Sequence, residues 1–193
     1  PDLEISIPVG KDSLSMQSRW QIDGEMHSAS SPVLLIITAF ARVDDVTAQL
    51  TPVLNTQLES DIWLIDLGAG KQRMGGSILA QVQNQFGQVC PDLDSPVLLK
   101  QLAGLIIDAR QQKLLHAYHD ISDGGVFTAL CEMAFASHCG LEICVDHCGE
   151  NDLSSLFNEE LGVLVQVSNE DRALFADLIN KYDLTHCAQR IAI

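Results

Sequence analysis

The 193-residue sequence has few basic residues and no long apolar run. Lysine and arginine number 11 against 26 aspartates and glutamates, so the formal net charge is −15. A chain this acidic repels a phosphate backbone, which argues against a nucleic-acid partner. No apolar run is long enough to cross a bilayer, and no basic stretch followed by an apolar one opens the chain. We therefore expect a cytoplasmic protein with no membrane partner.

The sequence also lacks closely paired cysteines. Its six cysteines stand at positions 90, 131, 139, 144, 148 and 187, and their spacing matches no common zinc pattern. The apolar content and the missing secretion signal argue against a disulfide framework. Cys144, His147 and Cys148 leave a zinc site open as an alternative. We favour the simpler interpretation, which is thiols on a strand and its exit loop.

Hydrophobic residues make up 47% of the chain, enough for a packed core. Residues 33–43 form a continuous apolar, β-branched run that predicts a strand buried on both faces. Further strands are predicted at 61–67, 114–119, 141–145, 162–167 and 185–193. Helices are predicted at 77–86, from Pro96 onward, at 125–137 and from about 170 to Tyr182.

This succession predicts an α/β fold of the layered α+β kind, with a mixed sheet and helices packed on it. Residues 1–31 differ from the rest because they show little helical periodicity and contain two glycines and a polar run. We interpret 1–31 as the remnant of a preceding domain plus a linker. Residues 32–193 are then the main domain.

The strongest local motif is His119-Asp120-Ile121-Ser122-Asp123-Gly124-Gly125, between a predicted strand and a predicted helix. Free N–H groups at a helix N-terminus attract anions, and glycines let a ligand approach closely. An aspartate there can hold Mg²⁺, and a serine can contact a phosphate oxygen. The alternative is an ordinary helix cap made by Ser122 or Asp123, and physical reasoning alone does not separate the two.

Two other segments carry cations in this acidic chain. The glycine-rich loop 68–77 contains Lys71 and Arg73, but it matches neither a P-loop nor a dinucleotide fingerprint. A ligand-binding loop and a flexible connection with solvated charges both remain open. Near the N-terminus, Lys11 follows a glycine and precedes Asp12, Ser13 and Ser15, so it could neutralise a phosphate. A surface turn explains that segment equally simply.

A fourth segment, residues 157–162 (FNEELG), places Glu159 and Glu160 just before a buried strand. We predict a solvated turn there.

Six segments together resemble the phosphoribosylformylglycinamidine synthase family in their order and spacing. They are PVGKDSLSM, SSPVLLIITAFARVDD, DLGAGKQRMGGSILAQV, AYHDISDGG, CEMAFASHCGL and FNEELGVLVQV. The resemblance covers essentially the whole chain. It implies the last part of one synthetase domain followed by most of a domain like the C-terminal one of aminoimidazole ribonucleotide synthetase. It also implies an ATP-dependent, glutamine-using ligase of purine biosynthesis.

The resemblance implies site residues as well. The aspartate at the position of Asp120 is a Mg²⁺ ligand of an auxiliary nucleotide site, and the serine at the position of Ser122 contacts the nucleotide. We assign Lys11, Gly124 and Gly125 to the same ATP or ADP site. The other magnesium ligands, the glutaminase domain and half of the synthetase are not in this chain. We therefore expect it to be inactive alone.

The expected partners are a small-molecule nucleotide and the remaining domains of the same polypeptide, with self-association through an exposed domain interface as a further hypothesis. The alternative function is a structural module that holds a nucleotide and a domain interface without a catalytic role.

Overall fold

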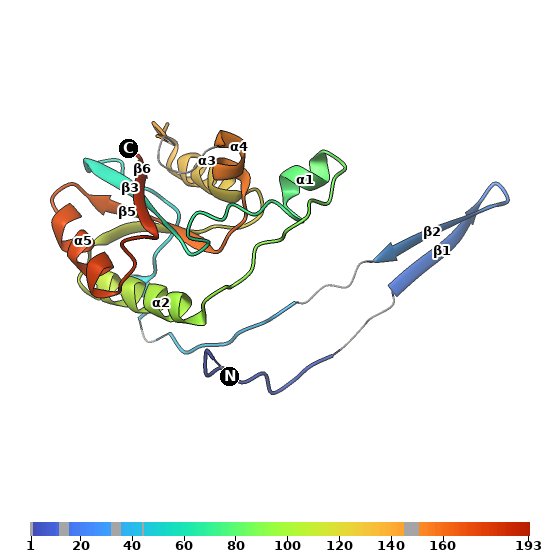
Figure 1. Cartoon of the computed structure of the whole chain (residues 1–193), viewed down its shortest axis with the longest axis horizontal. Coiled ribbons are helices and arrows are strands. Elements are labelled where there is room, and N and C mark those ends of the chain that lie inside the picture. Colours follow the sequence, from blue (N-terminus) through green and yellow to red (C-terminus); the bar gives the residue numbers. More distant parts are fainter. Residues whose placement is uncertain (1, 12–15, 32–35, 44, 145–150) are drawn as a thin grey trace. The chain divides into compact units, whose positions relative to one another are not determined.

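The computed structural model describes residues 2–11, 16–31, 36–43, 45–144 and 151–193. The chain forms two compact units, Pro1–Thr47 and Ala48–Ile193 (Figure 1). In the first unit, strands β1 (Met16–Ile22) and β2 (Glu25–Ser31) pair as an antiparallel hairpin. Asp23 and Gly24 both have positive φ at its turn, as two-residue hairpin turns require. This hairpin was not predicted from the sequence.

The strand predicted at 33–43 is wrong for residues 36–43, which form no strand and leave Ile36 and Phe40 84% and 94% exposed. Residues 32–35 lie outside the described residues. A strand buried on both faces needs neighbouring strands and covering layers. No described residue pairs with 36–43. The short 3-10 helix η1 (Val46–Ala48) follows.

The second unit is built on a four-stranded sheet with the order β4-β5-β3-β6. Its strands are β3 (Ser60–Asp66), β4 (Leu115–Asp120), β5 (Gly162–Ser168) and β6 (Ala188–Ala192). Every one of these pairings is antiparallel, so the predicted mixture of strand directions is wrong for this sheet. Ile143 bridges to Ala192 at the β6 edge, where a longer strand was expected.

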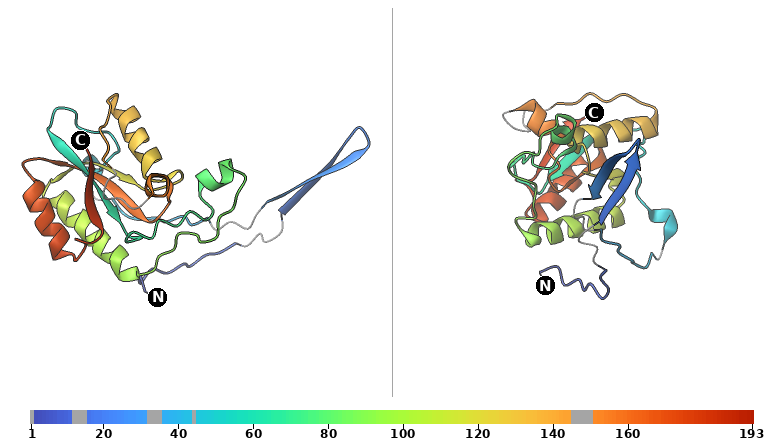
Figure 2. Two further views of the ribbon diagram at one scale, coloured as in Figure 1. Left: turned by 45° about the horizontal axis from the view of Figure 1, so that its top comes forward. Right: turned by 90° about the vertical axis from the view of Figure 1, so that its right-hand side faces the viewer.

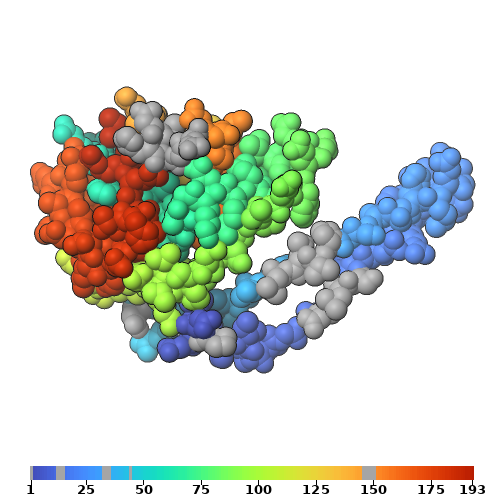
Figure 3. Space-filling view, viewed as in Figure 1, coloured from blue at the N-terminus to red at the C-terminus, as the bar shows by residue number. Residues whose placement is uncertain are grey.

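Helices cover both faces of this sheet (Figures 1 and 2). Helices α2 (Pro96–Gln111) and α5 (Arg172–Lys181) pack against the face that carries Ile65, Val163 and Val165. Their surfaces lie side by side in Figure 3. Helix α3 (Gly125–Ser137) packs against the opposite face, which carries Ile62 and Leu64. The predicted layered α+β class is therefore confirmed.

Two short helices complete the second unit. Helix α1 (Ile78–Val82) begins where predicted but ends four residues earlier than Phe86. Ser77 caps it by accepting a hydrogen bond from the Ala80 N–H group at 3.2 Å. Helix α4 (Asp152–Phe157) was not predicted, because six residues are too few to show a periodic pattern. Among the described residues, no helix is both long and apolar enough to span a membrane.

Candidate functional site

Three segments that are distant in the sequence meet in the second unit. They are the glycine-rich loop 68–77, the turn 119–125 and the segment 157–162. The Glu159 Oε1 atom accepts hydrogen bonds from the N–H groups of Ile78 and Gly124, each at 2.8 Å. The adjacent Glu160 accepts three from Arg73. The structure therefore joins three motifs that are separate in the sequence.

The turn 119–125 is shaped by its two glycines. Gly124 (φ 85°) caps α3, and Gly125 (φ 69°) opens it, in a backbone region that favours glycine. A Cβ atom on Gly125 would lie 2.4 Å from the Asn158 carbonyl oxygen. Both N–H groups are already engaged, Gly124 with Glu159 and Gly125 with the Ser122 carbonyl oxygen at 2.9 Å. The double glycine thus has a structural role within the chain itself.

Three polar side chains of the turn face solvent, and a fourth, His119, is partly buried. Asp120, Ser122 and Asp123 are exposed. The Tyr118 hydroxyl donates to the Asp120 Oδ1 atom at 2.5 Å. Burial, and then the Asp120 carboxylate, raise the pKa of Tyr118, so this hydroxyl stays protonated and remains a donor. Asp120 is therefore an accessible carboxylate with one oxygen held in place.

His119 points away from that surface, toward α3. Its Nε2 atom lies 2.7 Å from the Glu132 Oε2 atom, and its Nδ1 atom lies 2.6 Å from the Asp120 carbonyl oxygen. The contact with Glu132 therefore connects the end of β4 to α3.

The prediction of a solvated turn at 157–162 is wrong. The Glu160 side chain is 2% exposed and contacts Arg73 with Nε–Oε1 and Nη2–Oε2 distances of 2.7 and 2.6 Å. This is a two-point carboxylate–guanidinium pair. The Glu160 carboxylate raises the pKa of Arg73. Arg73 lies 87 residues away in the sequence, so no local pattern could reveal the pair.

The two cations of the glycine-rich loop pair with carboxylates outside the loop. The Arg73 side chain is 12% exposed, and its Nη2 atom lies 2.9 Å from the Asp94 Oδ2 atom. The Lys71 Nζ atom lies 2.8 Å from Asp94 Oδ1. At the start of the loop, the Asp66 carboxylate accepts hydrogen bonds from the N–H groups of Gly68 (2.8 Å) and Gly70 (3.3 Å). In this arrangement the Arg73 side chain is mostly buried, whereas the Lys71 side chain is 48% exposed.

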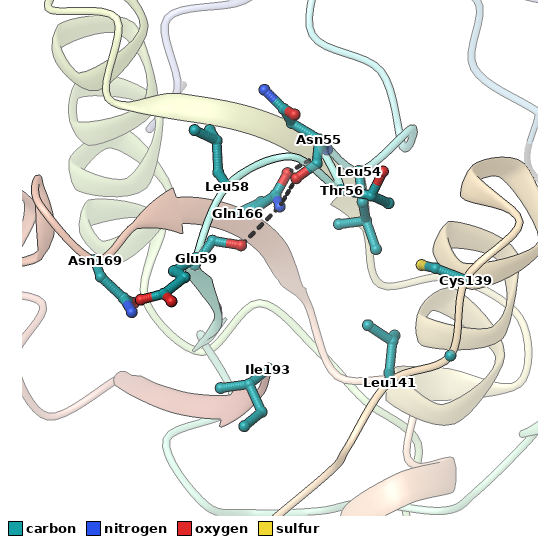
Figure 4. Close-up of a pocket in the computed structure, with 12 residues that line it drawn as sticks. Leu54, Asn55, Thr56, Leu58, Glu59, Cys139, Leu141, Gln166, Asn169 and Ile193 are labelled. Carbon is teal, nitrogen blue, oxygen red and sulfur yellow. Dashed lines mark hydrogen bonds between the residues drawn. The ribbon is translucent and has the colours of Figure 1, made fainter.

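A sizeable pocket lies elsewhere, at the other end of β3 and β5 (Figure 4). Its volume is about 460 Å³, and its lining is mainly apolar. The buried Gln166 carboxamide there bonds to the Asn55 backbone and to the Ser60 hydroxyl. None of the predicted site residues lines this pocket, so it is separate from the motif chemistry.

Other predicted ligands belong to different parts of the chain. Lys11 is an exposed residue of the first unit, while Asp12, Ser13 and Ser15 lie outside the described residues. Of the alternative zinc ligands, Cys144 is exposed, and His147 and Cys148 lie outside the described residues. Within the described ranges, no group of three or more His, Cys, Asp or Glu side chains could hold a metal ion.

Comparisons with known proteins confirm the resemblance expected from the sequence. The chain is 44% identical, over 99% of its length, to phosphoribosylformylglycinamidine synthase of Schizosaccharomyces pombe. It spans 15% of the length of that relative. Residues 1–42 also match the family described as FGAR-AT PurM_N-like domain.

Solved structures show the same fold at low sequence identity. Thermotoga maritima PurL complexed with ATP is 12% identical, with a TM-score of 0.57 over 86% of this chain and 24% of that one. Escherichia coli HypE, a hydrogenase maturation protein, is 14% identical, with a TM-score of 0.50 over 86% of this chain and 48% of that one. The three-layered second unit and the match of residues 63–192 together show that this chain belongs to the family of AIR synthase related proteins, C-terminal domain.

Proposed function

We propose that this chain is part of an ATP-dependent ligase of purine biosynthesis. The reaction would convert formylglycinamide ribonucleotide, glutamine, ATP and water to formylglycinamidine ribonucleotide, ADP, phosphate and glutamate. The observation that carries this proposal is the 44% identity to the S. pombe synthase across nearly the whole chain. Thermotoga PurL structures complexed with ATP, ADP, AMPPCP and FGAR share the fold and support nucleotide binding. The remaining domains of the longer polypeptide would be the partners.

Within that enzyme, we propose that Asp120 and Ser122 form one wall of an auxiliary Mg²⁺-nucleotide site. Asp120 fits the role of a magnesium ligand because it is an exposed carboxylate at a strand end, with one oxygen held by Tyr118. It would be a single ligand, so the others would come from elsewhere in the polypeptide. Bound Mg²⁺ neutralises phosphate charge, which an acidic chain needs in order to accept a nucleotide.

The remaining site residues stay predictions. Gly124 and Gly125 would contribute the shape of the turn, since their N–H groups are engaged within the chain. Lys11, a residue of the first unit, stays a predicted phosphate-binding cation. A cytoplasmic location and self-association through apolar side chains such as Ile36 and Phe40 are likewise proposed.

The test is an Asp120→Asn substitution in the full-length polypeptide. We expect synthase activity or nucleotide retention to fall by at least about tenfold, since loss of a ligand should cost no less than loss of a group that supports one. Steady-state kinetics and quantification of bound nucleotide would measure this. Unchanged turnover together with unchanged nucleotide content would contradict the assignment.

The second candidate is a structural module, in which the nucleotide stabilises the domain interface and takes no part in turnover. The observation that favours it is the internal bonding of the turn to α3 and to the glycine-rich loop. The same variant separates the candidates. A catalytic site predicts lower turnover at an unchanged thermal midpoint, whereas a structural site predicts a lower midpoint and lower yield first.

A further inference from the structure

Glu159 occupies a position where two helices begin. Its Oε1 atom accepts the N–H group of Ile78, the first residue of α1, and that of Gly124, the cap of α3. Both bonds measure 2.8 Å. The side chain comes from a segment 81 residues beyond Ile78 and 35 beyond Gly124. A single carboxylate oxygen thus joins three separate parts of the second unit.

The chemistry of helix ends explains why a carboxylate is favoured here. The first N–H groups of a helix have no partner within it and carry partial positive charge. A glutamate at the third position of a helix often bonds back to the N–H group of the cap residue. The third position of α3 is Phe127, which has no acceptor, and Gly124 has no side chain to supply one. Glu159 performs this capping function from outside the helix.

The surroundings hold Glu159 in place from both sides. Its neighbour Glu160 is anchored to Arg73, and the preceding Asn158 bonds through its amide nitrogen to the carbonyl oxygens of Ser154 and Ser155. The Asn158 side-chain oxygen also accepts the Glu160 N–H group at 3.2 Å. Glu159 therefore lies on a short segment with little freedom to shift.

The consequence concerns the proposed nucleotide site. Gly124 lies two residues after Ser122, and the Gly125 N–H group bonds to the Ser122 carbonyl oxygen. A displacement of Gly124 would therefore displace Ser122. The bond to Ile78 links that same turn to the start of α1, which directly follows the glycine-rich loop.

We infer that Glu159 is a positioning residue that holds the turn 119–125 and the start of α1, which directly follows the loop 68–77, in one fixed arrangement. The expected effect on nucleotide affinity rests on the proposed function, because it requires Ser122 to contact a nucleotide. Glu159 touches neither nucleotide nor metal in this role, but acts through Gly124 and Ser122.

The experiment uses the full-length polypeptide with Glu159→Ala and, as a shape-conserving variant, Glu159→Gln. Amide hydrogen exchange would be followed in peptides that contain Ile78 and Gly124, and ADP affinity would be measured by titration calorimetry. In Glu159→Ala, we expect both amides to exchange at least about tenfold faster, which is the weight of one hydrogen bond to a charged group. We expect ADP affinity to fall by a similar factor. Glu159→Gln keeps a neutral acceptor, so it should retain part of the amide protection and part of the ADP affinity.

Glu170→Ala is the matched control, because Glu170 is an exposed glutamate that follows the end of β5, whereas Glu159 precedes the start of that strand. It should leave both amides and ADP affinity unchanged. The inference is overturned if Glu159→Ala leaves either amide protected, or if both amides are released while ADP affinity stays the same. If Asp120→Asn has no effect on ADP affinity, the proposed function fails instead. The inference is then decided by exchange alone: joint release of the two amides supports it, and protection of either overturns it.

Discussion

Both carboxylate oxygens of Asp66 accept hydrogen bonds from the backbone of the loop that follows it. They accept the N–H groups of Gly68 and Gly70 and lie near Glu160. Burial, the largest effect, and the negative charge of Glu160 raise the pKa of Asp66, while the two backbone hydrogen bonds lower it. The net direction is upward, so the charged form of this side chain carries a cost in the folded chain.

That pKa shift leads to a prediction about pH. Because the folded state binds the proton of Asp66 more tightly than the unfolded state, its contribution to stability is complete below the unfolded pKa, 3.8, and is lost as pH rises through the folded pKa. The stability of the parent relative to Asp66→Asn should therefore increase as pH falls from neutral toward 4. Thermal midpoints measured across that range would show it. Asp177→Asn, an exposed position on α5, is the control. A pH-independent difference for Asp66→Asn would contradict the prediction.

At the scale of the element, the turn into α3 depends on close backbone packing. Gly125 faces the carbonyl oxygens of Asn158 and Leu156 at the end of α4. Its positive φ and this contact leave no room for a side chain. The path of the chain between β4 and α3 is therefore set jointly by two elements.

We expect Gly125→Ala to destabilise the polypeptide by about 2–5 kcal/mol, the sum of a left-handed backbone penalty and an overpacking penalty. Chemical denaturation would measure the change. Gly140→Ala provides a matched control, because a Cβ atom on Gly140 would meet nothing within 4 Å. Equal stability of the two variants would show that the contact with α4 carries no weight.

At the scale of the whole molecule, the sheet of the second unit has a hydrophobic cluster on each face. One cluster includes Leu105 and Phe175 from α2 and α5, and the other includes Leu130 and Met133 from α3. The two clusters give this unit a core of its own. The proposed nucleotide wall, in contrast, needs groups from outside the chain.

This difference predicts that the isolated 193-residue chain has no synthetase activity. Asp120 is a single carboxylate, and the described residues contain no complete metal-ligand cluster. A sensitive assay of ADP formation with formylglycinamide ribonucleotide, ATP and an ammonia source would test this. Substrate-dependent turnover above that of an Asp120→Asn chain would overturn the prediction.

Local patterns were sufficient for most elements of the second unit. Pro96, at the first helical position, placed the start of α2, and the apolar run before Asp66 placed β3, because helix-start signals and hydrophobic patterns act over a few residues. The motif 119–125 was likewise found where a strand ends and a helix begins. The run at 36–43 misled the prediction, because apolar, β-branched residues favour a strand only when neighbouring strands are present.

The sequence by itself thus determined the family resemblance, the layered class and the candidate residues Asp120 and Ser122. Only the tertiary structure decided that Glu160 pairs with Arg73, and that Glu159 binds the ends of both α1 and α3. The physical reason is that local sequence patterns report only on residues a few positions apart. Hydrogen bonds and ion pairs depend on distance in space, and these partners stand 35 to 87 residues apart along the chain.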